Sequence, residues 1–234
     1  LVNFSSLLGK KFNPPTRTIA RIEKKKGQLL QMSGTSDMIF CECRFITNKF
    51  DIVLDFRLLN QTAVVLSNIK LELNCVGKLE LIDRAAPLTL KPDQAENLRL
   101  TIKVTSAEAG KIFGSISYDI SNSSYYLPLA LITVPSSDFM ESSTISLTDF
   151  RKKWDVFEWE KRTAVHHAYE SFNDFISKIA DVSKLNAISD IDPELPFLTT
   201  NLYSKSFFGE EVLANVNVEL KDGIITGFIR LRTN

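Results

Sequence analysis

The sequence predicts an all-β immunoglobulin-like sandwich followed by a smaller α+β unit, an antiparallel sheet with two helices. Between residues 37 and 134, short runs with an apolar side chain at every second position follow one another, separated by Asn, Gly, Pro and Asp. Such spacing is typical of antiparallel sandwiches. After residue 146 the apolar residues first recur at helical spacing and then alternate again near the C-terminus, which indicates a second, mixed unit.

Seven strands are expected in the first unit. They cover residues 39–45, 51–59, 69–73, 78–82, 98–104, 112–118 and 125–133. Cys41 and Cys43 are two residues apart on the first strand, so we expect both thiols on one face. Three cysteines in this spacing suit neither a zinc site nor a disulfide framework, and we expect free thiols. No Cys–Trp–Cys pattern occurs, which excludes an antibody-type domain.

The polar stretch 135–143 separates the two units, and we place the boundary between residues 138 and 139, so that the sandwich covers 32–138 and the second unit 139–234. Ser146 and Asp149 have the spacing of a capping box, which predicts a helix start there. A strand is expected at 159–165 and a second amphipathic helix at 168–182. Three strands follow at 197–204, 213–220 and 224–231, and the Asp-Gly pair before the last predicts a hairpin.

Charge is balanced over the 234 residues, with 28 basic and 28 acidic side chains, but residues 1–31 hold seven basic and one acidic. This segment has little apolar periodicity and is interpreted as a basic linker or arm. A nucleic-acid binder would show a wider positive excess. The longest apolar run, 127–134, is too short for a membrane-spanning helix. Because the sequence does not begin with Met, we expect a piece of a longer polypeptide.

The chain offers no motif for catalysis, a cofactor or a metal. His166 and His167 are neighbours and therefore do not share a face. No Gly-rich phosphate-binding loop and no Gly-x-Ser-x-Gly turn occur. Three glycosylation acceptors begin at Asn3, Asn60 and Asn122, about as many as chance would give. An extracellular adhesion domain, a third hypothesis, would require glycans at Asn60 or Asn122.

One aromatic pair is a candidate binding site. Phe150 and Trp154 lie four residues apart, on one face of the expected helix, beside Arg151 and Lys153. Two interpretations are open. Trp154 is either part of the core, or an exposed apolar anchor with a cationic rim for an aromatic side chain of a short acidic peptide.

Several motifs, taken in order, resemble one family. They are Asp51–Thr62, Pro87–Pro92, Ile112–Asp119, Trp154–Glu160, Asn201–Glu210, Leu213–Asn215 and Gly227–Arg232. Together they are similar to the appendage (ear) domain of coatomer beta subunits, components of the COPI vesicle coat. The resemblance covers residues 28 to 232.

The resemblance implies an immunoglobulin-like sandwich joined to an appendage platform, without catalytic activity. It implies a cytosolic coat subunit that associates peripherally with Golgi membranes and COPI vesicles through an Arf-type small GTPase. The role would be retrograde Golgi-to-ER and intra-Golgi transport. Partners would be other coat subunits and accessory proteins with short acidic or aromatic motifs, not nucleic acid or a small-molecule substrate. The alternative is a purely structural coat-packing domain without a peptide groove.

Related appendages have a platform site built around Phe-x-x-x-Trp on the first platform helix. Phe150 and Trp154 have this spacing, so the resemblance implies that Trp154 binds protein partners. The full candidate set adds cations beside the pair and residues near strand ends: Arg151, Lys153, Tyr203, Lys205 and Arg230.

Overall fold

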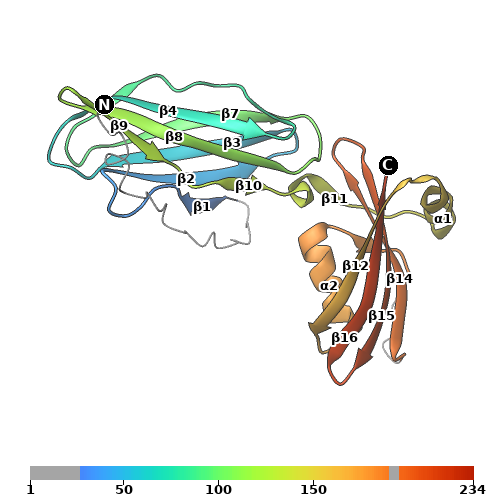
Figure 1. The fold of residues 1–234 in the computed structure, drawn as a ribbon. Coiled ribbons are helices and arrows are strands. Elements are labelled where there is room, and N and C mark those ends of the chain that lie inside the picture. Colours follow the sequence, from blue (N-terminus) through green and yellow to red (C-terminus); the bar gives the residue numbers. More distant parts are fainter. Residues whose placement is uncertain (1–26, 190–194) are drawn as a thin grey trace, which may run out of the picture.

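The computed structural model describes residues 27–189 and 195–234 (Figure 1). Most of the expected basic arm, including Lys10 to Lys26, lies outside the described residues. Residues 28–31, which we expected to belong to that arm, instead form a strand that pairs with the next one. The sandwich therefore begins earlier than predicted, because Leu29 and Leu30 lie in the ladder opposite Arg44 and Cys43.

Two antiparallel sheets form the sandwich. The first has the order β1 (Gln28–Gln31), β2 (Ile39–Thr47), β3 (Asp51–Asn60), β7 (Ala95–Val104), β5 (Leu79–Leu81). The second has the order β10 (Ile132–Val134), β8 (Gly110–Ile120), β4 (Leu66–Val76), β6 (Leu88–Leu90), and β9 (Ser123–Pro128) also pairs with β8. The strand expected at 125–133 is thus two strands, since residues 129–131 form no ladder.

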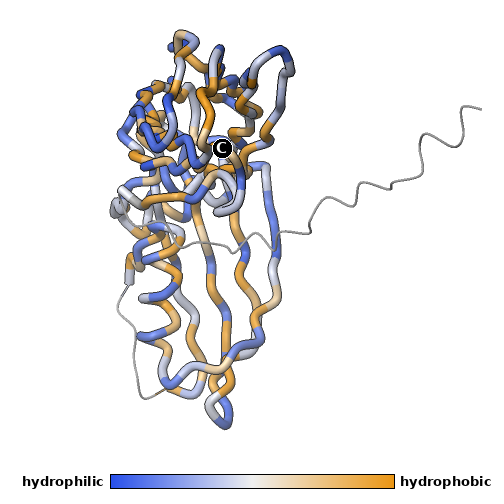
Figure 2. The backbone as a smooth tube through the Cα atoms, turned by 90° about the vertical axis from the view of Figure 1, so that its left-hand side faces the viewer, coloured by the Kyte–Doolittle hydropathy of each residue, from blue (hydrophilic) through white to orange (hydrophobic). Residues whose placement is uncertain are grey.

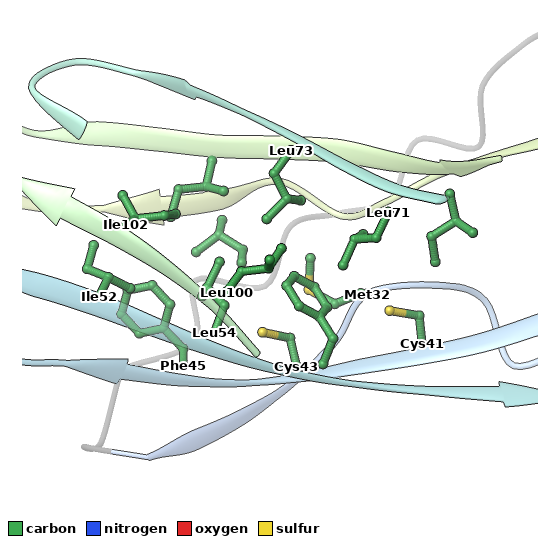
Figure 3. Packing of buried hydrophobic residues seen from close by; sticks show 14 of the residues in the cluster. Met32, Cys41, Cys43, Phe45, Ile52, Leu54, Leu71, Leu73, Leu100 and Ile102 are labelled. Atoms are coloured by element: carbon green, nitrogen blue, oxygen red, sulfur yellow. The ribbon is translucent and has the colours of Figure 1, made fainter. Parts of the chain in front are cut away.

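The core lies between these sheets, where alternate side chains of β2, β3 and β7 point inward (Figure 3). Cys41 and Cys43 are fully buried, unpaired and on the same face of β2, as predicted. Burial raises the pKa of the Cys41 thiol to about 12 and that of Cys43 still further. Both thiols therefore stay protonated and act as small apolar side chains.

Asn60 is fully buried at the end of β3. Its amide nitrogen donates to the carbonyls of Val64 (2.8 Å), Leu90 (3.1 Å) and Lys91 (3.0 Å). The nitrogen that would carry a glycan therefore faces the interior. This contact removes Asn60 from the support for an extracellular adhesion domain.

The C-terminal unit is an antiparallel sheet with two helices. The sheet has the order β11 (Met140–Ser142), β14 (Phe197–Ser206), β15 (Glu211–Lys221), β16 (Ile224–Thr233), β12 (Trp159–Ala168), and β13 (Asn186–Ala187) pairs with β14. The helices are α1 (Leu147–Val156) and α2 (Phe172–Ser183), and a 3₁₀ turn, η2 (Ser136–Phe139), precedes β11. The second helix starts later than predicted, because Ser171 caps it by accepting from the amide of Asp174.

The helices cover the two faces of this sheet unequally. Apolar residues of α2, such as Phe175 and Ile176, pack on one face along with Val216, and Figure 1 shows α2 along that face. On the other face α1 reaches only the end formed by Tyr203 and Leu213. Hydrophobic and hydrophilic positions alternate along these strands (Figure 2), and no helix of the described residues covers the rest of this second face.

A turn of the C-terminal unit also packs against the sandwich. The ring of Phe208, in the β14–β15 turn, lies 5.5 Å from that of Phe50 and 6.3 Å from that of Phe139. Phe139 is fully buried in the sandwich core cluster. A carboxylate oxygen of Glu210 accepts from the backbone amide of Ala107 at 3.3 Å. One apolar cluster therefore spans both units.

Gly227 in β16 is required by its surroundings. Its φ is +146°, and a Cβ there would lie 2.2 Å from the carbonyl oxygen of Asn217. We expect Gly227→Ala to lower the free energy of unfolding by about 2–4 kcal/mol, because backbone atoms of β15 would have to move. Gly223, with φ +74° and open space, is the control, and Gly223→Ala should cost about 1 kcal/mol. Equal losses in chemical denaturation would contradict this account.

Candidate functional site

Helix α1 positions the aromatic pair. Ser146 caps the helix by accepting from the amide of Asp149 at 3.1 Å, which confirms the predicted start. One turn on, the rings of Phe150 and Trp154 stack 5.5 Å apart at 19°. Phe150 is only 3% exposed, whereas Trp154 is half-buried. Phe150 is therefore part of the core, whereas Trp154 lies at the margin of the contact between α1 and the sheet.

Tyr203 lies in the sheet under α1 and is also buried. We expected Phe150 and Tyr203 to bind partners, but both side chains are buried in the structure. They pack together with Leu213 because α1 must bury its apolar face on this end of the sheet. Their contribution is to support Trp154 rather than to contact a partner.

The predicted cationic rim is different in the structure. Lys153 donates to Glu211 at 2.6 Å, so its charge is already paired. Arg151 and Lys205 are exposed. Among the described residues, the cations over the Trp154 ring come from β16: the guanidinium carbon of Arg232 is 4.9 Å and that of Arg230 is 5.8 Å from its centroid.

Arg230 was one of our sequence candidates, whereas Arg232 was missed. Arg232 donates to Glu160 at 2.6 Å and also to the carbonyl of Trp154. It therefore ties the end of α1 to β12 and β16. The signal for it was the register that places Glu160 opposite Arg232, and this register is not evident from either segment alone.

Beyond Trp154 the open face of the sheet is polar. Asn215 donates to Asn201 at 2.9 Å and accepts from Arg230 at 3.3 Å. Further along, Phe197 and Asn217 border a shallow depression. A broad face with one aromatic edge and adjacent cations suits an extended peptide, while a small molecule requires a deep, enclosed pocket.

Trp159 does not compete with Trp154 for this surface. It is 76% exposed but begins β12, one residue before Glu160. Since successive side chains of a strand point to opposite faces, Trp159 lies on the face away from Arg232. It provides a matched control for experiments on Trp154.

Two family models match the chain. One, described as "Coatomer beta C-terminal region", matches residues 9–120, and the other, "Coatomer beta subunit appendage platform", matches residues 123–234. The chain belongs to the coatomer beta family. This confirms the sequence resemblance. The chain is the C-terminal appendage of a coatomer beta subunit, and the family is one of non-catalytic coat proteins.

Coatomer beta proteins from distant organisms are similar along most of the chain. Coatomer subunit beta-2 of Oryza sativa subsp. japonica is 38% identical over 88% of this chain and 22% of its own length. Coatomer subunit beta of Rattus norvegicus is 34% identical over 90% and 23%, and that of Drosophila melanogaster 31% over 97% and 24%. The chain thus spans less than a quarter of these relatives.

Among solved structures, the GAE domain of GGA2p from Saccharomyces cerevisiae is similar at 16% identity with a TM-score of 0.36, over 45% of this chain and 96% of that domain. This likeness is too distant to support the assignment further.

The predicted fold class, a sandwich followed by an appendage platform, is confirmed. The family models divide the chain between residues 120 and 123, whereas β9 and β10 pair with β8 in the sandwich. Our boundary at 138/139 stays a prediction. Within residues 27–189 and 195–234, no helix has the length and apolar character needed to cross a bilayer.

Glu211 links α1 to the sheet and gives the site a pH dependence. Burial alone would raise the pKa of its carboxyl, but hydrogen bonds from Lys153 and Tyr203 hold it below the usual value near 4.5. Because the folded pKa is the lower one, this stabilisation is present above the unfolded pKa and is lost as the pH falls through the folded pKa.

We therefore expect Glu211→Gln to lower the free energy of unfolding at pH 7 by about 1–3 kcal/mol, since it leaves Lys153 without its partner. The difference from the wild type should shrink below about pH 4.5. Urea denaturation at pH 7 and at pH 3.5 measures both effects. Glu219→Gln, an exposed change on the same strand face, should cost less than about 0.5 kcal/mol. A loss that is the same at both pH values would be inconsistent with this role of Glu211.

Proposed function

We propose that this appendage is a protein-interaction module of the COPI coat that binds accessory proteins or other coat subunits through the surface around Trp154. The observation that carries the proposal is the half-buried Trp154 ring, which is flanked by Arg230 and Arg232 at the end of a sheet face that the described helices otherwise leave open. Aromatic and arginine side chains in such surroundings are the residues that dominate protein interfaces.

The partner segment would be short and extended, with an aromatic side chain against Trp154 and acidic residues toward the arginines. Such a contact is small, with a dissociation constant in the micromolar range, or about −8 kcal/mol. The whole subunit would act in Golgi-to-ER retrograde and intra-Golgi transport. It would associate peripherally with the cytosolic face of Golgi membranes and COPI vesicles, through the assembled coat and an Arf-type GTPase. Neither nucleic acid nor a small-molecule substrate is part of this proposal.

The second candidate is a domain that only packs within the coat. The stacking of Trp154 on Phe150, together with the bond from Arg232 to the Trp154 carbonyl, favours it, because both contacts hold α1 in place. In that case Trp154 matters for folding and no peptide occupies the sheet face.

Trp154→Ala separates the two candidates. We expect binding of coat subunits and accessory proteins from cytosol to fall about thirtyfold, which corresponds to ~2 kcal/mol for a central anchor. The free energy of unfolding should fall by less than the ~3–5 kcal/mol of a fully buried tryptophan. Pull-down with quantitative mass spectrometry and urea denaturation give the two values.

Trp159→Ala is the control, because it also removes a tryptophan side chain, but from the face of the sheet opposite to Trp154. It should leave binding unchanged. Partners that remain bound to a folded Trp154→Ala protein, or that are lost equally with Trp159→Ala, would sink the Trp154 site. A loss of 3–5 kcal/mol in stability with unchanged partners would favour the packing role.

A further inference from the structure

Two arginines face each other on the open face of the platform sheet. Arg162 of β12 and Arg230 of β16 are directly paired in the antiparallel register, so their side chains leave the sheet on the same side. Like charges in this arrangement destabilise a sheet. A negatively charged group close to both arginines would relieve this repulsion.

The described residues do not supply a counter-charge to this pair. Within the described residues, neither Arg162 nor Arg230 forms an ion pair. The neighbouring Arg232, by contrast, pairs with Glu160 at 2.6 Å. The only hydrogen bond from the Arg230 guanidinium within that part of the chain goes to the neutral side chain of Asn215.

Arg230 also has a donor without an acceptor. Its Nε is buried and, among the described residues, has no hydrogen-bond partner. Leaving a charged donor buried and unpaired costs free energy. This observation is independent of the pairing with Arg162 and shows that the hydrogen-bonding capacity of the Arg230 guanidinium is not fully used among the described residues.

The ring of Phe228 contacts the guanidinium groups of both Arg162 and Arg230. The guanidinium carbon of Arg162 lies 3.9 Å and that of Arg230 lies 5.8 Å from the centre of the Phe228 ring. Contact with one aromatic ring restrains both groups while their N–H edges stay free to donate. The other neighbour of Arg230 is the Trp154 ring, so the arginine pair adjoins the proposed aromatic anchor.

We propose that Arg162 and Arg230 bind the phosphate of a phosphorylated side chain in the segment whose aromatic residue lies on Trp154. This inference rests on the proposed function and specifies the chemistry of the partner. A phosphate carries about −1.5 to −2 charges at pH 7 and has three acceptor oxygens. It can therefore neutralise both arginines, whereas one carboxylate leaves a positive charge uncompensated.

The test uses three fluorescein-labelled peptides that differ at one position. Each peptide has one phenylalanine and one variable position, which is phosphoserine, glutamate or serine. The set of three is made with the variable position two, three or four residues from the phenylalanine. In fluorescence anisotropy with the whole chain, we expect the phosphoserine peptide of the best spacing to bind at least tenfold more tightly than its serine counterpart, because charge-assisted hydrogen bonds form. Equal affinities for all three peptides at every spacing would overturn the proposal.

Arg162→Gln and Arg230→Gln should each reduce the preference for phosphoserine about tenfold. Lys161→Gln is the matched control, since it removes the same charge from the adjacent position on the other face of β12, and it should keep the preference. Trp154→Ala tests the proposed function separately, because it should weaken all three peptides alike. A phosphoserine preference that survives both arginine changes refutes the phosphate site, even when Trp154→Ala confirms the anchor.

Two further measurements distinguish other roles of the pair. Inorganic phosphate should raise the melting temperature of the wild type but not that of a variant with both Arg162→Gln and Arg230→Gln. Without phosphate, Arg162→Gln alone should not lower the melting temperature, because it removes a like-charge contact. A drop of several degrees for Arg162→Gln would show a structural role instead.

The second measurement uses vesicles with and without a phosphoinositide. If the protein sediments with the vesicles in a manner that depends on the two arginines, and shows no preference for phosphoserine, a lipid site would replace this proposal.

Discussion

In the described part of the platform, a six-stranded sheet with two faces and only two short helices constrains everything else. Helix α2 is amphipathic and buries its apolar stripe on one face. Helix α1 buries a single fully enclosed residue, Phe150, at one end of the other. The remaining surface of that second face is left to asparagine, threonine, arginine and aromatic side chains. A sheet face can stay in water only with such residues, and these are also the residues from which a recognition surface is built.

The contacts that hold α1 explain how one tryptophan combines support and recognition. Lys153 and Tyr203 converge on Glu211 from the helix and the sheet, and Arg232 reaches the last turn from β16. These bonds fix α1 in position with Phe150 facing inward. Trp154, one turn later, then lies against Arg230 and Arg232 near the end of β16. Its partial burial follows from where the helix ends.

Local patterns predicted more of the fold than of the site. Alternating apolar residues located the strands, the Ser146 cap located α1, and Asp222 and Gly223, both with positive φ, form the expected hairpin. The start of α2 was wrong because Ala168 still belongs to β12 and the cap lies at Ser171. Arg162 and Arg232 were missed because their role depends on strands about seventy residues apart lying in one register, which the individual segments do not encode.

The Phe208 turn has a consequence for how such an appendage can evolve. The β14–β15 turn of the platform packs against the core of the sandwich. Phe139, which lies between the two units in the sequence, contacts residues of both. Recombination that exchanged only the sandwich or only the platform would separate Phe208 from the aromatic rings of Phe50 and Phe139. The two halves are therefore expected to be inherited together, with substitutions at positions 50, 139 and 208 constrained as a group, while the open face of the sheet remains free to diversify.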